Sequence, residues 1–442
     1  MNNALFLDDW TVDAVEKPDR KTYRIKARYD TLPDACPKCG SVGRLYKWAT
    51  IPTEYLDAPV HGRRTIIVVE KQRLRCRECG ATFMQPLPDM DPKRSLTKRA
   101  VEYIAEQALY DTNLSVARTL GVQEKTVRQI VDEANAEREA NHRISGPLIL
   151  GIDELVLQGE PRAILIDVGH GRILDILPDR TIGLVHRWLS WLPDRERVHI
   201  VTTDMWNPYR EATYAALPNA VIVADKWHVQ KKIGEAVDKV RNRLARNLSR
   251  AQRRKALRGR RLLLTHRGRL SPRAAFVLDG WLKNNPVLND AWEMKEMLYG
   301  LWDAPDRANA EALFAEMKES IRPSVAEEFG EFCRTIDNWY AEVFAYFDHR
   351  QTNATTEALN GVVKIANRAG RGYHFKQIRA RALFAPRRAN PVMVCEECLG
   401  RFDPQHLPML TVGWHPRICP TCMAFNVPGW VKPHGRSTPK SE

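Results

Sequence analysis

The sequence has no apolar run near the roughly 18 residues that a membrane-spanning helix requires. Its first residues, MNNALFLDDW, contain two early acids and no basic cluster, so they do not resemble a secretory signal. It also has no low-complexity tract, and no internal repeat beyond recurring cysteine pairs. These absences argue against a membrane or secreted protein. They predict a cytoplasmic chain that has no membrane partner.

Acidic residues are outnumbered. The 442 residues include 68 Lys and Arg against 54 Asp and Glu, which gives a net charge of +14. A basic chain of this kind favours a polyanionic partner, most simply nucleic acid. The hydrophobic fraction of 44% is sufficient for buried cores, and the length suggests roughly two to four domains.

Composition predicts a multidomain protein that combines α+β and α/β parts. Short strands and two cysteine pairs are expected near the N-terminus, and a proline-rich connector, Gln85–Pro92, ends that zone. The expected zones are an N-terminal metal-binding domain (1–90), a helical domain (93–142), a mixed domain (147–230), an all-helical domain (231–350), a further helical segment (351–388) and a cysteine-rich tail (389–442).

The mixed zone shows apolar strands before it shows helices. Strands are expected at Leu148–Glu154, Arg162–Val168, Arg172–Leu177, Val198–Asp204 and Asn219–Asp225, with helices at Ile182–Leu192 and Tyr209–Leu217. A three-strand meander followed by alternating helices and strands implies a mixed sheet covered by helices. Farther on, apolar residues from Phe329 to Phe347 recur at helical spacing and predict one amphipathic helix, in which Cys333 is a buried hydrophobic residue.

Eight of the nine cysteines form C-x-x-C pairs. Two thiolates at this spacing bind one face of a tetrahedral ion, and two pairs complete a structural Zn²⁺ site with no open position. The first site is expected at Cys36, Cys39, Cys76 and Cys79, and the second at Cys395, Cys398, Cys419 and Cys422. The pairs could also combine across the two ends of the chain, so one or two structural zinc ions are expected. Buried cysteines without metal would leave the paired spacing unexplained.

The segment Asn113–Val131 has the pattern of a helix-turn-helix. Ala117 is small where two helices would cross, and Gly121 permits the turn. Inward positions are expected at Leu120, Val127 and Ile130. Side chains on or near the outer face of the second helix could reach DNA bases and phosphates: Gln123, Lys125, Thr126, Arg128 and Gln129. An ordinary helical hairpin is the alternative.

A basic run lies between Arg241 and Leu270, with twelve Lys or Arg and no acid. Its helical pieces could place arginines along a phosphate backbone. The arginines proposed for this track are Arg241, Arg243, Arg246, Arg250, Arg253, Arg254, Arg258, Arg260 and Arg261. A solvated helix face is the alternative, although such faces normally mix the two signs of charge.

Carboxylates end two of the expected strands. If the strands before Asp153 and Asp204 are neighbours, their acids converge at one edge of the sheet, where they repel unless cations lie between them. Hard divalent ions such as Mg²⁺ favour such oxygen ligands. Farther on, Glu357, Asn360 and Lys364 share one helical face that suits a metal and phosphate site.

The chain resembles the ISL-three family of bacterial insertion-sequence transposases over nearly its whole length. The resemblance rests on the cysteine pairs, the helix-turn-helix, and the segments Gly151–Glu154, Thr203–Tyr209, Pro218–Val229 and Thr356–Gly361. It implies an RNase H-like core, formed by 147–230 and 351–388, that a helical insertion interrupts at 231–350. The cysteine-rich tail beyond about residue 390 departs from the common pattern.

The same resemblance implies a D-D-E triad of Asp153, Asp204 and Glu357. It also places His228, within a D-x-x-H segment that starts at Asp225, near the reacting phosphate. Asp225 is the rival for the second acid. Each residue has a plainer alternative: Asp153 as a turn residue, Asp204 as a helix cap, Glu357 as a first-turn acid, and His228 as a packed histidine. Asp167, Asp175 and Asp179 are interpreted as solvent-face or turn residues.

The function expected from the residues and the resemblance together is transposition. Two Mg²⁺ or Mn²⁺ ions at the triad would support DNA cleavage and strand transfer at terminal inverted repeats. The expected partners are terminal-repeat and target double-stranded DNA and, because two ends are joined, a second copy of the chain. The expected location is the bacterial cytoplasm, in association with the nucleoid. The rivals are a non-catalytic DNA-binding regulator and a nuclease that cuts without joining.

Overall fold

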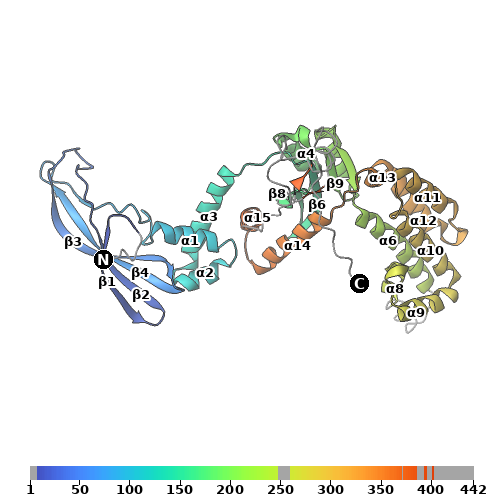
Figure 1. Ribbon diagram of the computed structural model, residues 1–442, viewed down its shortest axis with the longest axis horizontal. Helices are drawn as coiled ribbons and strands as arrows, with labels where there is room; N and C mark the ends of the chain where they lie inside the picture. Colours follow the sequence, from blue (N-terminus) through green and yellow to red (C-terminus); the bar gives the residue numbers. More distant parts are fainter. Residues whose placement is uncertain (1–6, 247–258, 371, 386–392, 396–400, 403–442) are drawn as a thin grey trace, which may run out of the picture. The chain divides into compact units, whose positions relative to one another are not determined.

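The computed structural model describes residues 7–246, 259–370, 372–385, 393–395 and 401–402 (Figure 1). The chain divides into two compact units. One contains the residues up to His142 together with the segment Ala369–Ala385, and the other runs from Arg143 to Arg368. Among the described residues, none of the helices combines the length and hydropathy needed to span a bilayer.

The first unit contains a five-stranded sheet. Its strands are β1 (Trp10–Asp19), β2 (Thr22–Tyr29), β3 (Leu45–Val60), β4 (Arg63–Cys76) and β5 (Thr82–Met84). The order is β1-β2-β4-β3 with β5 beside β4, and only the β2–β4 pair is parallel. The expectation of short strands is wrong for β3 and β4, which have 16 and 14 residues. Much of β3 is solvent-exposed and polar, so its length left no clear apolar signal.

Four helices complete the first unit: α1 (Lys98–Gln107), α2 (Asn113–Leu120), α3 (Glu124–Asn141) and α15 (Phe375–Phe384). The hydroxyls of Thr97 and Thr112 cap α1 and α2. Gly121, with φ of 72°, ends α2 in the left-handed region, which glycine adopts without strain. The predicted inward residues, Leu120, Val127 and Ile130, are buried in the core of these helices.

Helix α15 packs against α3, although the sequence suggested that residues 351–388 stay with the mixed sheet. The Arg381 side chain is buried and donates hydrogen bonds to the carbonyl oxygens of Ala108 and Asp111. Arg379 pairs with Glu139 of α3 at 2.7 Å. These contacts join α15 to a helix that precedes it by about 240 residues, and no local pattern could have indicated them.

The second unit contains a five-stranded mixed sheet, as predicted. Its strands are β6 (Ile149–Leu157), β7 (Glu160–Asp167), β8 (Arg172–Ile176), β9 (Ile200–Thr203) and β10 (Val221–Ala224). The order is β10-β9-β6-β7-β8; β6, β9 and β10 are parallel, and β7 pairs antiparallel with both of its neighbours, β6 and β8. Helices α4 (Ile182–Trp191) and α5 (Asn207–Ala216) pack onto the sheet through one hydrophobic cluster.

Helix α14 (Ala354–Ala369) approaches β6 at Gly151. A Cβ at this glycine would lie 2.4 Å from the Thr356 Oγ1 atom and 2.9 Å from Val168. Only glycine therefore allows the start of α14 to lie this close to the strand. The consequence is that the first turns of α14 lie beside the residues that follow Gly151 on β6.

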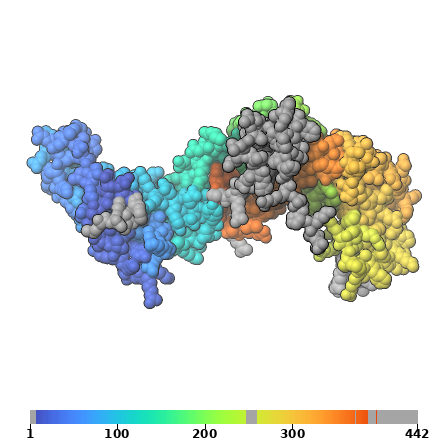
Figure 2. Space-filling view, in the orientation of Figure 1, coloured from blue at the N-terminus to red at the C-terminus, as the bar shows by residue number. Residues whose placement is uncertain are grey.

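The remaining helices form the insertion between β10 and α14. They are α6 (Lys226–Ala245), α8 (Arg260–Leu264), α9 (Pro272–Lys283), α10 (Pro286–Leu301), α11 (Arg307–Glu319), α12 (Ala326–Asn338) and α13 (Tyr340–His349). In the space-filling view the insertion forms one yellow-to-orange body (Figure 2).

The remaining elements are short. 3₁₀ turns lie at Arg195–Arg197, Arg267–Arg269 and Pro323–Val325. A pair of two-residue strands, β11 (Met393–Val394) and β12 (Arg401–Phe402), follows α15 in the sequence.

The single helix predicted for residues 329–347 is two helices. The break falls at the buried Trp339, which has φ of −115° and ψ of 25°. Arg210 lies over the Trp339 ring at 4.3 Å and donates a 2.7 Å hydrogen bond to the Asn338 carbonyl oxygen, which satisfies the end of α12. Cys333 is buried, as predicted.

Candidate active site

Neighbouring parallel strands bring three aspartates to one edge of the sheet. Ile152 of β6 pairs with Thr203 of β9, so Asp153 and Asp204 are the next residues along adjacent strands. Thr203 also pairs with Ala224 of β10, which Asp225 follows. The condition that the sequence left open, adjacency of the two strands, is therefore met.

Helix α14 brings its polar face to the same edge. The Asn360 Nδ2 atom donates a 2.8 Å hydrogen bond to Asp153 Oδ2. The buried Asn353, immediately before the helix, accepts a hydrogen bond from the Thr202 hydroxyl at 3.1 Å, and its carbonyl oxygen accepts from the Glu357 N–H at 3.0 Å. Asn353 thus links β9 to the turn that carries Glu357. The sequence interpretation missed it, although a polar residue just before a helix is a common capping signal.

A cavity of about 480 Å³ lies at this edge of the sheet. The three predicted acids and the predicted histidine, asparagine and lysine all line it: Asp153, Asp204, Glu357, His228, Asn360 and Lys364. Further lining residues were not predicted, and they include Glu154, Trp206, Trp227, Lys231 and Lys232. Lys231 and Lys232 follow His228 at helical spacing, which is the signal that could have indicated them.

Asp225 differs from Asp204 in its surroundings. Its Oδ1 accepts a 3.4 Å hydrogen bond from the Trp227 N–H at the start of α6, so Asp225 is the cap of that helix. It does not appear among the residues that line the cavity, whereas Asp204 does. Of the two rivals, Asp204 therefore faces the cavity and Asp225 caps a helix.

Burial and mutual repulsion raise the pKa values of these aspartates. Burial raises the pKa of Asp153 to about 7, and the nearby acids, Asp204 first, contribute to the same shift. Burial also raises the pKa of Asp204 to about 6, although the charge of Arg180 opposes the shift. Asp225 is raised to a pKa of about 6, again mainly by burial. A bound cation would relieve this repulsion, so the cluster of buried aspartates at the edge of the sheet favours cation binding.

Buried oxygens near this edge of the sheet lack a hydrogen-bond partner. They include Asn360 Oδ1, from a residue that lines the cavity, and Asp225 Oδ2, from a residue that does not. Buried polar atoms are normally satisfied, so orphaned oxygens beside acidic side chains fit water or a divalent cation with oxygen ligands. The donor set of carboxylates and amide oxygens is the one that Mg²⁺ and Mn²⁺ prefer.

Basic groups line the rest of the cavity wall. Burial, together with Lys231 and Lys232, lowers the pKa of His228 to about 4, so its imidazole is neutral near pH 7. The Trp227 ring packs edge-on against His228 at 4.8 Å and is half exposed. Arg180 pairs with Glu154 and lies 4.4 Å from the Trp206 ring. A cavity with acids at one wall and cations around it suits a phosphodiester.

The sulfur atoms of the four N-terminal cysteines gather in one cluster. All four sulfur atoms lie within 4.8 Å of one another, with Sγ–Sγ distances of 3.7 Å for Cys36–Cys79 and 3.8 Å for Cys39–Cys76. Zn–S bonds of about 2.3 Å in a tetrahedron place sulfurs about 3.8 Å apart, so these residues fit a structural zinc ion. Gly40 and Gly80, with φ near 70°, turn the chain after each pair. Of the C-terminal cysteines, Cys395 is buried, and Cys398, Cys419 and Cys422 lie outside the described residues.

The outer face of α3 is accessible in the structure. Gln123, Lys125, Arg128 and Gln129 are exposed, and Thr126 is partly buried. Arg128 also pairs with Glu124 one turn earlier on α3. The predicted polar surface is therefore present.

Acids outside the basic run neutralise part of it, one from the same helix α6 and one from α12. Asp238 pairs with the buried Arg241 at 3.0 Å and with Arg260 at 2.6 Å, and Glu328 pairs with Arg243 at 2.8 Å. Arg246 and Arg261 are exposed. The predicted residues Arg250, Arg253, Arg254 and Arg258 lie outside the described residues. Asp238 lies just before the run and Glu328 lies 85 residues beyond Arg243, so the run taken alone looked more uniformly positive than the folded surface is.

Comparisons with known proteins match this order of parts. A family model for the zinc finger of transposases IS204, IS1001, IS1096 and IS1165 matches residues 32–79. The model for the helix-turn-helix domain of transposase family ISL3 matches residues 85–135, and the ISL3 transposase model matches residues 150–382. The transposase for insertion sequence element IS1001 of Bordetella parapertussis is 26% identical over 385 residues, which cover 84% of this chain and 94% of the relative.

The fold, the site and these matches define the class as a transposase of an insertion sequence, with its own zinc finger and DNA-binding helix-turn-helix. Within that class, the chain belongs to the ISL3 (ISL-three) family. The resemblance expected from the sequence is thereby confirmed.

Proposed function

We propose that this transposase cleaves and joins DNA strands at the ends of its insertion sequence, with Asp153, Asp204 and Glu357 as the catalytic acids. The observation that carries the proposal is the cavity that all three acids line, together with His228, Asn360 and Lys364. The sheet order β10-β9-β6-β7-β8 supports an RNase H-like core.

The three acids, with the orphaned oxygen of Asn360, would hold two Mg²⁺ or Mn²⁺ ions. Bound there, the ions would activate water or a DNA 3′-hydroxyl and stabilise the leaving oxygen. Among the described residues, only the four zinc-finger cysteines gather their ligand atoms within 4.8 Å. A wider spacing of the acids suits two ions, which lie about 3.5–4 Å apart in such sites.

The chain's own residues would position the DNA. Asn360 orients Asp153 through its 2.8 Å hydrogen bond. Lys364 and Lys231, on opposite elements of the cavity, would bind phosphate oxygens on either side of the reacting bond. His228, neutral near pH 7 because of its lowered pKa, would donate a hydrogen bond to the reacting phosphate without adding charge.

DNA recognition would belong to the zinc finger and the helix-turn-helix. Helix α3 would enter a major groove of the terminal repeat, where Gln123, Lys125, Thr126, Arg128 and Gln129 would contact bases and phosphates. The exposed arginines of the insertion, Arg246 and Arg261, would hold flanking or target DNA. Two ends are joined in one event, so a homodimer on DNA is proposed.

The test supplies pre-cleaved terminal-repeat duplexes with free 3′-hydroxyls, a target plasmid and Mg²⁺. The wild-type chain should form joined products, and Glu357→Gln should lose at least roughly 100-fold in joining, because the electrostatic support of the transition state depends on this acid. Glu327→Gln, at an exposed acid of α12, is the matched control and should join normally. Specific binding with no cutting in the wild type would instead indicate a regulator, and cutting without joining a nuclease.

A further inference from the structure

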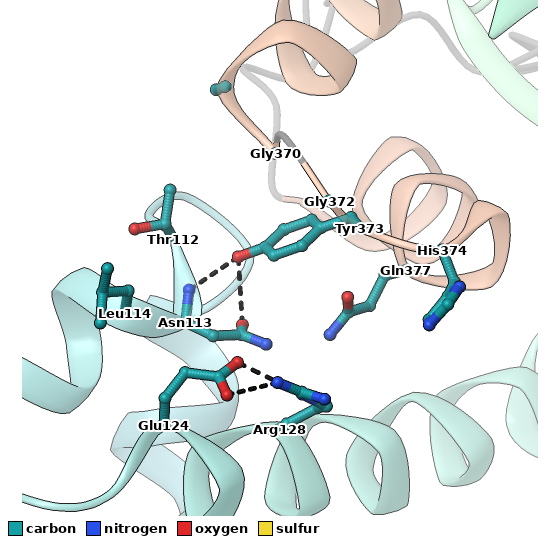
Figure 3. Close-up of a pocket in the computed structure, with 11 residues that line it drawn as sticks. Thr112, Asn113, Leu114, Glu124, Arg128, Gly370, Gly372, Tyr373, His374 and Gln377 are labelled. Atoms are coloured by element: carbon teal, nitrogen blue, oxygen red, sulfur yellow. Dashed lines mark hydrogen bonds and ion pairs between the residues drawn. The ribbon is translucent and has the colours of Figure 1, made fainter. Parts of the chain in front are cut away.

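A second cavity, of about 370 Å³, lies in the first unit beside the helix-turn-helix (Figure 3). It is formed by the start of α2, the first turns of α3, and the start of α15. Residues from these elements point into it, among them Asn113, Arg128, His374 and Gln377 (Figure 3). The cavity is therefore shared by the DNA-recognition helices and by a helix that lies far along the chain.

Tyr373 fixes the position of Asn113 in this cavity. The Asn113 backbone N–H donates to the Tyr373 hydroxyl at 2.6 Å, and the hydroxyl donates to Asn113 Oδ1 at 3.2 Å (Figure 3). The amide group of Asn113 is thereby oriented with Oδ1 toward the Tyr373 hydroxyl. Asn113 is 2% exposed, and its Nδ2 atom has no hydrogen-bond partner.

Gln377 of α15 presents a second unpaired hydrogen-bond donor to the same cavity. It is 9% exposed, and its Nε2 atom is buried without a partner. A buried N–H group that lacks an acceptor costs free energy, so two such groups lining one cavity indicate a missing acceptor. Asn113 is also the first residue of an eight-residue helix, α2, whose dipole favours negative charge at that end.

The charged groups at the cavity are one cation and one anion. Arg128 donates to Glu124 through both its Nε and Nη2 atoms (Figure 3). A guanidinium has five N–H donors, so Arg128 can keep Glu124 and also donate to a second acceptor. The exposed His374 adds a further ring nitrogen at the rim. The cavity is thus rich in donors and close to neutral, which suits one oxygen of a phosphodiester better than a free multivalent anion.

We propose that this cavity binds one phosphate of the DNA backbone next to the major groove that α3 enters, and that Asn113 and Gln377 supply the hydrogen bonds. The first helix of a helix-turn-helix crosses the backbone, so the start of α2 lies where such a phosphate is found. Helix α15 would then be a part of the DNA-binding surface. This inference rests on the proposed DNA recognition by α3.

The test uses Gln377→Leu, which removes the donor but keeps the size of the side chain. Because the amide is unpaired in the free protein, the midpoint of thermal unfolding should stay unchanged or rise. Affinity for the terminal-repeat duplex should fall roughly tenfold, the usual effect of losing a hydrogen bond to a charged group. A phosphate contact carries no sequence information, so affinity for an unrelated duplex should fall by the same factor.

A duplex series with single methylphosphonate substitutions identifies the phosphate. The wild type should lose affinity at one particular position, and Gln377→Leu should lose nothing further at that position. His374→Ala, at an exposed residue, gives a second variant that does not threaten the fold, and it should show a smaller loss at the same position. Equal affinity of wild type and Gln377→Leu, or additive losses at every position, would overturn the phosphate site alone. Absence of repeat binding by the wild type would overturn the proposed recognition as well.

Discussion

Asn360 donates a 2.8 Å hydrogen bond to Asp153, although 207 residues separate them in sequence. The bond joins β6, at the start of the mixed sheet, to α14, which follows the whole helical insertion. It opposes the burial that raises the pKa of Asp153, because a donated hydrogen bond stabilises the ionised carboxylate. The amide therefore helps keep Asp153, the proposed metal ligand, ionised near pH 7.

Replacing Asn360 with alanine should shift the pH dependence of strand joining. Without the donor, the pKa of Asp153 rises further above about 7, so the acidic limb of the pH–rate profile moves to higher pH. The rate at pH 7 should fall roughly tenfold and recover in part at pH 8.5, since a shift of one pKa unit is one decade in the ionised fraction. Asn367→Ala, on the same helix, is the control. A uniform loss at every pH would point to distorted packing.

Neutralising Asp153 should stabilise the metal-free protein. The pKa of Asp153 in the folded state, about 7, lies above its ordinary value of 3.8, so the folded state binds the proton more tightly. Stability contributed by the protonated group is complete below about pH 4 and is lost as pH rises through 7. Asp153→Asn removes that loss, which amounts to a few kcal/mol at about 1.4 kcal/mol for each pKa unit.

Thermal unfolding of Asp153→Asn at pH 8, in buffer without divalent cations, should therefore show a midpoint several degrees above the wild type. The buffer must contain no chelator, because a chelator would also remove the zinc. Asp279→Asn, which breaks an exposed pair with Arg267, should leave the midpoint almost unchanged. A lower midpoint for Asp153→Asn would show that the carboxylate is held by favourable contacts.

The zinc finger should depend on all four thiolates. Cys76→Ser should remove one zinc ion per chain, measured by atomic absorption, because a hydroxyl does not replace a thiolate at such a site. Binding to the terminal repeats should weaken, because the two cysteine pairs at the end of the long β3–β4 hairpin would lose their order. Cys333→Ala, at a buried cysteine of α12, should retain the full zinc content. An unchanged zinc content in Cys76→Ser would place the metal elsewhere.

Patterns within short stretches predicted most of the core correctly. The apolar residues before Asp153 and Asp204 placed both acids at one edge, because the parallel strands β6 and β9 pair up to Ile152 and Thr203. The predicted end of the first strand at Glu154 is wrong, since β6 continues to Leu157 in its pairing with β7. Helical spacing placed Glu357 and Asn360 on one face of α14. The C-x-x-C spacing predicted the cysteine cluster but left the combination of pairs open, and the structure brings the two N-terminal pairs together.

Features that depend on distant contacts were not predictable in this way. The docking of α15 depends on Arg381 reaching carbonyl oxygens of Ala108 and Asp111, which no local pattern encodes. The ion pairs of Asp238 with Arg260 and of Glu328 with Arg243 depend on how the insertion folds back on α6. The break at Trp339 leaves the apolar spacing intact on both sides. The periodicity of the sequence therefore predicted one continuous helix where the structure has two.

A substitution at Gly151 should reduce strand joining without affecting the zinc finger or DNA binding. A methyl group there would lie 2.4 Å from Thr356 Oγ1, so in Gly151→Ala the start of α14 must move away from β6. Glu357 and Asn360 would move with it, and a displacement of about 1 Å at a reacting centre can cost roughly 100-fold in rate. Strand joining should fall by that order. Zinc content and affinity for the terminal repeats should stay at the wild-type level, because both belong to the other unit.

The matched control is Gly361→Ala, on the same helix. A Cβ at Gly361 meets nothing within 4 Å, and alanine is the better helix former by about 1 kcal/mol, so this variant should join normally and unfold at a slightly higher temperature. Equal activity of Gly151→Ala and Gly361→Ala would mean that α14 tolerates displacement from β6. The proposed role of Glu357 as a fixed third acid would then be lost, whereas loss in Gly151→Ala alone ties the chemistry to this one close approach.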